Sequence, residues 1–126
     1  MAHILLVDDD VFVLEALKLG LEEKGHTVTA AEHGNAGMKA VNQESFDLVI
    51  TDLIMPEKEG MEFLIEIKEK YPSLKVIVVS GGGRISASSY LDTAKTFGAD
   101  DILAKPFSMS EMNARINQVL RESNAL

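Results

Sequence analysis

Cysteine is absent from this sequence of 126 residues, which excludes a disulfide framework, a thiolate zinc site and a thiol nucleophile. No uninterrupted apolar run approaches the roughly 20 residues that a transmembrane helix needs. Basic residues are also scarce, since 12 lysines and arginines against 20 aspartates and glutamates give a formal charge of −8. A surface that binds nucleic acid directly is usually basic. The composition therefore argues against a nucleic-acid-binding protein and against a membrane protein.

The length and composition that are present fit one globular domain. A chain of 126 residues is long enough for a single hydrophobic core. Its hydrophobic share of 46% and charged share of 25% are ordinary for a soluble protein. The N-terminal stretch MAHILLVDDD ends in acidic residues, unlike a secretory signal peptide. We expect a cytoplasmic protein that does not enter a membrane.

Strand-like and helix-like segments alternate along the whole chain. Short apolar or β-branched runs predict strands, and apolar residues three or four apart predict helices. The predicted strands cover 3–7, 27–31, 48–51, 74–79 and 101–104, and the predicted helices cover 13–21, 35–44, 60–71, 87–97 and 109–120. Such alternation favours right-handed crossovers and a parallel sheet with helices on both faces. We expect an α/β fold with a doubly wound, five-stranded parallel sheet and five helices over residues 1–122, followed by a tail at 123–126.

The stretch Phe46–Pro56 is central to this arrangement. Leu48–Thr51 is an apolar, β-branched run that fits a strand covered on both faces. Asp52 ends the run, and the proline at position 56 has no N–H for further pairing. Ligands of open α/β sheets bind beyond the carboxyl ends of the strands, where this places Asp52. The stretch alone leaves two interpretations equally open: Asp52 has a chemical role, or it only terminates a strand.

Polar residues follow four of the five predicted strands. Asp8 and Asp9 follow the first strand, Asp52 the third, Ser80 the fourth and Lys105 the fifth. If the first strand lies between the second and the third, these residues meet at one edge of the sheet. Three ionised carboxylates a few ångströms apart repel by several kcal/mol at an effective dielectric of about 20, and one lysine cannot offset them. Mg²⁺ can, because it prefers oxygen ligands and also binds phosphate oxygens.

This combination of residues favours phosphoryl transfer. Asp52 would be the nucleophile that forms an aspartyl phosphate, while Asp8 and Asp9 would hold Mg²⁺. Lys105 and Ser80 would bind phosphoryl oxygens, where negative charge develops. The sequence therefore predicts a metal site that also takes a phosphoryl group.

Four motifs in order, ILLVDDD, LVITDLIMPEKEG, VIVVSG and AKPF, resemble those of receiver domains of bacterial two-component response regulators. The chain is similar over its whole length to the single-domain, chemotaxis-like type. The resemblance implies a flavodoxin-like sheet with strand order 2-1-3-4-5. It also implies that the domain accepts a phosphoryl group from a phosphohistidine of a sensor kinase or histidine phosphotransfer protein. The domain would then switch conformation to control a downstream protein target or a fused output domain.

The resemblance also assigns a role to individual residues. Asp52 would be the phosphoacceptor, Ser80 stands where the family has its switch Ser or Thr, and Lys105 is the family's lysine. The bond from Lys105 to Pro106 is often cis in the family. The implied Mg²⁺ ligands are Asp8, Asp9, Asp52 and the backbone carbonyl of Ile54.

The sequence departs from the family pattern in two places. Many receivers carry Tyr or Phe two or three residues before the lysine, where this chain has Ile102–Ala104. Neither Tyr90 nor Phe107 stands at the matching position. The loop that begins at Ser80 contains three consecutive glycines, which lower the barriers to rearrangement. We hypothesise that this loop and the helix after it form a mobile, specialised output surface.

Three alternatives stay open at this point. An aspartyl-phosphate phosphatase or phosphotransferase usually has a second acid two residues after the nucleophile, where this chain has Ile54, and it needs a substrate cap. We therefore expect self-phosphorylation and autodephosphorylation only, and no other enzyme activity. A receiver-fold scaffold that is regulated without phosphorylation would fit the missing aromatic residue. The chain could also be the N-terminal regulatory domain of a longer transcription factor or enzyme.

Two smaller expectations concern residues near these motifs. Asp10 is expected to favour the start of a helix rather than to bind a metal. The histidines do not cluster at the spacing of metal ligands, and we expect them at the surface: His3, His26 and His33.

Overall fold

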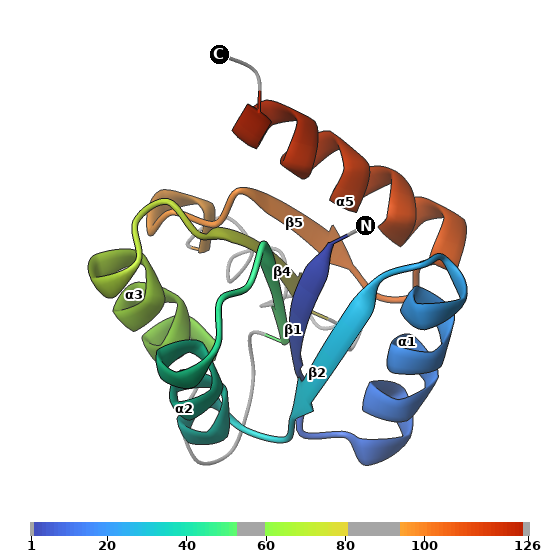
Figure 1. Ribbon diagram of the computed structural model, residues 1–126, viewed down its shortest axis with the longest axis horizontal. Helices are drawn as coiled ribbons and strands as arrows, with labels where there is room; N and C mark the ends of the chain where they lie inside the picture. The colour runs from blue at the N-terminus through green and yellow to red at the C-terminus, as the bar shows by residue number, and fades with distance from the viewer. Residues whose placement is uncertain (1, 53–59, 81–93, 125–126) are drawn as a thin grey trace.

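The structure, a computed structural model, describes residues 2–52, 60–80 and 94–124. It contains one parallel sheet with the strand order β2-β1-β3-β4-β5 (Figure 1). The strands are β1 (His3–Val7), β2 (Thr27–Ala31), β3 (Leu48–Asp52), β4 (Lys75–Ser80) and β5 (Asp101–Ala104). The helices with described bounds are α1 (Val11–Glu23), α2 (Gly34–Gln43), α3 (Gly60–Lys70) and α5 (Met109–Asn124). The expected doubly wound sheet and its strand order are confirmed.

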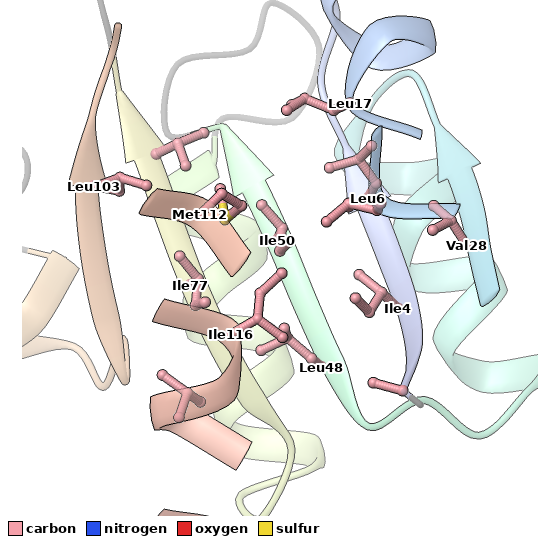
Figure 2. Close-up of a cluster of buried hydrophobic side chains, with 14 of the residues drawn as sticks. Ile4, Leu6, Leu17, Val28, Leu48, Ile50, Ile77, Leu103, Met112 and Ile116 are labelled. Atoms are coloured by element: carbon pink, nitrogen blue, oxygen red, sulfur yellow. The ribbon is translucent and has the colours of Figure 1, made fainter. Parts of the chain in front are cut away.

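Helices cover both faces of the sheet, with α1 and α5 on one side and α2 and α3 on the other (Figure 1). Because successive strand residues point to opposite faces, each central strand contributes to two hydrophobic cores. On β1, Leu5 and Val7 pack in the core under α2 and α3. Ile4 and Leu6 pack in the core under α1 and α5, which Figure 2 shows. β3 is buried along its whole length, which explains why its sequence is apolar almost throughout rather than alternating.

The buried positions of α3 and α5 follow the helical spacing in the sequence. Phe63, Leu64 and Ile67 of α3 are completely buried, as are Met112 and Ile116 of α5. Burying a side chain of this size contributes about 1.5–3 kcal/mol relative to leaving it exposed. The same apolar spacing therefore fixes helices on both faces of the sheet.

Particular residues fix the start of α1 and the turns that lead from helices to the next strands. Asp10 Oδ1 accepts hydrogen bonds from the N–H groups of Phe12 and Val13, so Asp10 is the N-cap of α1. This agrees with the expected role of Asp10 at a helix start. The turn after α1 contains Gly25, whose φ of 96° suits glycine. Gly98 has a φ of 108° in the turn that leads to β5.

The bounds of most elements agree with the sequence prediction to within two residues, whereas two segments differ further or lie partly outside the described residues. Residues 94–96 are helical, but most of the helix expected over 87–97 lies outside the described residues, as does most of the loop after Ser80. α5 continues to Asn124, so the helix extends into the segment that was expected to be a tail. None of the helices within the described ranges is both long and apolar enough to cross a membrane.

The expectation that all three histidines lie at the surface is wrong for His26. This residue is 8% exposed. Its Nδ1 accepts a hydrogen bond from the N–H of Ala2 at 3.3 Å, and its Nε2 lies 3.1 Å from Asn113 Oδ1 on α5. His26 therefore links the start of β1 and the loop before β2 to the last helix.

Candidate functional site

The register of the sheet brings the carboxyl ends of its central strands to one edge. β1 and β3 are paired as far as Thr51, and β4 and β5 are paired as far as Ser80. Asp8, Asp52 and Lys105 each lie two residues beyond a strand residue that packs under α1 and α5. Alternation along the strands therefore turns these three side chains to the same side.

One ammonium group bridges two of the carboxylates at this edge. Lys105 Nζ donates to Asp52 Oδ2 at 2.9 Å and to Asp8 Oδ2 at 3.2 Å. Carboxylate oxygens of Asp8, Asp9 and Asp52 lie within 4.8 Å of one another. Asp8 is 1% exposed and Asp52 is 9% exposed, whereas Asp9 is exposed to solvent. The structure thus brings together the four charged residues that the sequence predicts at this site.

The start of α1 orients the Asp8 carboxylate. Asp8 Oδ1 accepts a hydrogen bond from the N–H of Asp10 at 2.9 Å, and its other oxygen accepts from Lys105. Asp10 in turn is held by its own role as the N-cap of α1. Because both Asp8 oxygens have donors, this carboxylate has a fixed direction before any ligand binds.

Burial and charge shift two pKa values in the cluster. Burial raises the pKa of Asp8 above its usual 3.8, and the charge of Asp52 acts in the same direction, while the Asp10 N–H and Lys105 oppose the shift. Burial alone would lower the pKa of Lys105, but the hydrogen bonds and charges of Asp52 and Asp8 hold it above its usual 10.5. Lys105 therefore stays a cation, and ionised Asp8 is an unfavourable state that a further cation would stabilise.

Ser80 lies at the same edge with an unused hydroxyl. The residue is 1% exposed, and its Oγ has no hydrogen-bond partner in the part of the chain that the structure describes. The Ser80 carbonyl accepts from the Lys105 N–H at 2.8 Å, so its backbone is tied to the residue that bridges the carboxylates. A buried hydroxyl without a partner is unfavourable. Ser80 lies two residues after Val78, which packs under α2 and α3, so alternation along β4 turns its side chain to the other side of the sheet from the Asp52 carboxylate.

The residues at this edge fit a hard divalent cation. All the candidate ligand atoms are carboxylate oxygens, which Mg²⁺ prefers, and one lysine leaves an excess of negative charge. Asp8, Asp9 and Asp52 would hold the ion. Ile54, whose backbone carbonyl was expected as a further ligand, lies outside the described residues.

The structure describes Ile102, which stands where many receivers have an aromatic residue, and one of the two aromatic candidates. Ile102 is partly buried and packs against the core under α2 and α3. Phe107 is partly buried on the opposite side, against the core under α1 and α5. Tyr90, the other aromatic candidate, lies outside the described residues. The Lys105–Pro106 bond is cis, as the resemblance implies.

Two features of the structure were not predicted from the sequence. The hydroxyl of Thr51, which directly precedes Asp52, donates to the Asp52 carbonyl at 3.0 Å. A groove of about 740 Å³ lies at the opposite edge of the sheet, lined by residues 41–47 and 70–74. Asp8, Asp9 and Asp52 do not line this groove, so the groove is separate from the proposed metal site.

Comparisons with known proteins agree with the family resemblance of the sequence. The sequence model of the response regulator receiver domain matches residues 4–117. The chain is 37% identical over 122 residues to the transcriptional regulatory protein GlrR of Escherichia coli K12, covering 97% of this chain and 27% of GlrR. It is 39% identical to the CpxR homolog of Haemophilus influenzae, covering 98% of this chain and 52% of that protein. The chain therefore spans only about a quarter to a half of the length of these curated relatives.

Solved structures show the same similarity over the whole domain. A response regulator receiver domain protein from Clostridium thermocellum superposes with a TM-score of 0.89 at 32% identity, covering 99% of this chain and 98% of that one. NtrX from Brucella abortus superposes with a TM-score of 0.91 at 29% identity, covering 98% of this chain and 28% of NtrX. With the acidic edge and its lysine in place, these matches show that the chain belongs to the response regulator receiver domain family.

Proposed function

We propose that the chain is a phosphoacceptor switch in which Asp52 takes a phosphoryl group from a phosphohistidine of a sensor kinase or histidine phosphotransfer protein. The observation that carries this proposal is the position of Lys105. Its Nζ lies 2.9 Å from Asp52 Oδ2, and carboxylate oxygens of Asp8, Asp9 and Asp52 lie within 4.8 Å of one another. Such crowding of carboxylates destabilises the folded state, and a cation bound in addition to Lys105 would relieve it. The Ser80 hydroxyl has no hydrogen-bond partner among the described residues, and once turned toward Asp52 it would be a donor for a second, anionic ligand.

Each side chain has a separate task in the transfer. An oxygen of Asp52 attacks phosphorus, and as the new O–P bond forms, the N–P bond of the phosphohistidine breaks and its electron pair stays on the histidine nitrogen. Lys105 moves an N–H donor from Asp52 to a phosphoryl oxygen, and Ser80 donates its hydroxyl to another. Asp8 and Asp9 would hold Mg²⁺ together with Asp52. The bound ion would neutralise charge that develops on the phosphoryl oxygens.

Phosphorylation would act by shifting the population of two conformations. The favoured conformation would bind a downstream protein or a fused output domain. The domain would catalyse its own phosphorylation and autodephosphorylation and no other reaction. We propose a cytoplasmic location, which is usual for regulators with this domain. Because the matched transcriptional regulators are longer than this chain, an output domain that acts on transcription is the favoured partner.

Replacement of Asp52 tests the proposal directly. Asp52→Asn keeps the size of the side chain but removes the nucleophilic carboxylate. We expect the wild-type chain to gain hydroxylamine-labile phosphate from acetyl phosphate and Mg²⁺, and the variant to lose at least about 99% of this labelling, since the nucleophile is essential. Asp47→Asn, an exposed aspartate outside the acidic edge, is the control and should label like wild type. Undiminished labelling of Asp52→Asn would remove Asp52 from the mechanism.

A scaffold that works without phosphorylation is the second candidate, because Ile102 stands where many receivers have an aromatic residue. Capture of binding partners with and without beryllofluoride, an analogue of the acyl phosphate, separates the two. A phosphoacceptor switch should capture a different set of proteins in the two conditions. Identical sets would favour the scaffold.

A further inference from the structure

Thr51 is a buried polar residue that the proposed mechanism does not use. It is 0% exposed, and its hydroxyl donates to the backbone carbonyl of Asp52 at 3.0 Å. Alternation along β3 turns the Thr51 side chain toward α2 and α3, away from the side on which the Asp52 carboxylate lies. Thr51 therefore contacts the backbone of the phosphoacceptor without touching the reacting oxygens.

The strand pairing around Asp52 shows what this hydrogen bond adds. Thr51 is paired with a residue of β1 and with a residue of β4. In the described sheet, Asp52 is paired with β4 only, because the pairing of β1 with β3 ends at Thr51. The N–H of Asp8, the next residue after β1, donates to Ala31 of β2 instead. The Thr51 hydroxyl thus restrains the peptide group of Asp52 at the point where the ladder to β1 has ended.

The hydrophobic core itself has no need of a hydroxyl at this position. The neighbours of Thr51 on the same side of the sheet include Val7, Val49 and Val78, all buried. Valine has nearly the shape of threonine and would bring no polar group into this core, whereas a buried hydroxyl must be hydrogen-bonded. A role in stability and a role in positioning Asp52 are therefore separable by experiment.

We propose that Thr51 is a positioning residue for phosphoryl transfer: its hydroxyl fixes the Asp52 peptide plane and so sets the direction from which the carboxylate meets phosphorus. This inference rests on the proposed function. Transfer reactions depend steeply on such alignment, and a misplacement of about 1 Å can lower a rate about a hundredfold. Loss of one backbone restraint is a smaller disturbance, and we expect a fall of about tenfold.

Two substitutions of Thr51 form a matched pair. Thr51→Val removes the hydroxyl and keeps the volume, whereas Thr51→Ser keeps the hydroxyl and removes a methyl group. Thr29→Val makes the same chemical change on β2, away from Asp52. Labelling by acetyl phosphate at saturating Mg²⁺ is followed over a range of acetyl phosphate concentrations, and thermal unfolding is measured in parallel.

We expect Thr51→Val to lower the maximal rate about tenfold, with an unchanged half-saturating acetyl phosphate concentration and no fall in melting temperature. Thr51→Ser should keep a near wild-type rate although it melts at a lower temperature, and Thr29→Val should label normally. Equal rates in Thr51→Val and wild type would overturn the inference, and so would equal losses in Thr51→Val and Thr51→Ser. A wild-type chain that takes up no phosphate would instead overturn the proposed function on which it rests.

Discussion

Asp8 bears the largest electrostatic penalty in the acidic cluster. It is the most deeply buried of the three carboxylates, and unit charges about 5 Å apart repel by about 3 kcal/mol at an effective dielectric of 20. Lys105 offsets part of this repulsion, but it shares its ammonium group between Asp8 and Asp52. The pKa of Asp8 is raised because burial, together with the charge of Asp52, outweighs the stabilisation of the ionised carboxylate by Lys105 and the Asp10 N–H. The folded, metal-free domain therefore holds this proton more tightly than the unfolded chain does.

The pH dependence of unfolding should report this penalty. Since the pKa of Asp8 is raised on folding, its stabilising contribution is full below the usual value of 3.8 and is lost as the pH rises through the folded value. Asp8→Asn cannot undergo this loss. We expect the metal-free variant to exceed wild type in the free energy of unfolding at pH 7 by on the order of 1 kcal/mol, and the difference to shrink toward acid pH.

Urea unfolding at stepped pH in the presence of a chelator measures this difference. Asp9→Asn is the matched control, because Asp9 is exposed and solvent screens its charge. Its effect should be smaller at every pH. If Asp8→Asn were less stable than wild type at pH 7, the bond between Lys105 and Asp8 would outweigh the repulsion, and the electrostatic account would be wrong.

At the scale of elements, close approach of α2 to the core depends on Gly37. A Cβ atom at this position would lie 2.8 Å from Phe63 Cζ and 3.1 Å from Val7 Cγ2. Both neighbours are buried, so α2 or the core would have to shift. We expect Gly37→Ala to destabilise the domain by about 1–3 kcal/mol, although alanine has the higher helix propensity by about 1 kcal/mol.

Gly20 on α1 offers a matched control for this change. A Cβ atom there would approach the Sδ and Cε atoms of Met109 at 3.0 Å, and these atoms belong to the end of a flexible side chain. Gly20→Ala should therefore lie within about 1 kcal/mol of wild type, or exceed it, through helix propensity. Urea unfolding of both variants decides the matter, and similar stabilities for the two would show that α2 has room to move.

Most elements could be predicted from the sequence because their causes are local. β1, β2 and β5 have the bounds predicted from the sequence, and the Asp10 cap lies where acidic residues precede an apolar helix face. The meeting of Asp52 with Lys105 also follows from the pattern, since parallel strands place their carboxyl ends at one edge. Alternating strands and helices therefore predict a parallel α/β sheet, whereas the strand order that brings the charged residues together was implied by the resemblance to receiver domains.

The features that were missed depend on contacts that no sequence pattern encodes. His26 is buried, and its ring contacts Asn113, which lies 87 residues away in the sequence. The Thr51 hydroxyl bond depends on the local direction of one carbonyl, while the strand pattern requires only a β-branched residue there. Side-chain alternation is readable from sequence, but individual polar contacts are not.

For the whole molecule, the general repulsion that comes from a formal charge of −8 must be distinguished from the local repulsion at the acidic edge. Self-repulsion of the excess acids is spread over the surface, and any salt screens it. The acidic edge at Asp8, Asp9 and Asp52 is different, because its carboxylate oxygens lie within 4.8 Å of one another and a divalent ion can contact several at once. At constant ionic strength, general screening should therefore be the same in Mg²⁺ and in other salts, whereas a specific site should add stability only with Mg²⁺.

Mg²⁺ should raise the melting temperature of the wild-type chain beyond the effect of NaCl at matched ionic strength. An ion that binds only the folded state adds about 2.7 kcal/mol of stability at 100 times its dissociation constant. Asp52→Asn and Asp8→Asn each remove a carboxylate from the cluster, so both should lose most of this increment while keeping the response to NaCl. Because binding to the folded state must follow the ion concentration, the shift should also grow with log[Mg²⁺] above saturation. Equal melting temperatures in the two salts, or an increment that survives in both variants, would place the ion elsewhere and leave the crowding of the three aspartates without its proposed ligand.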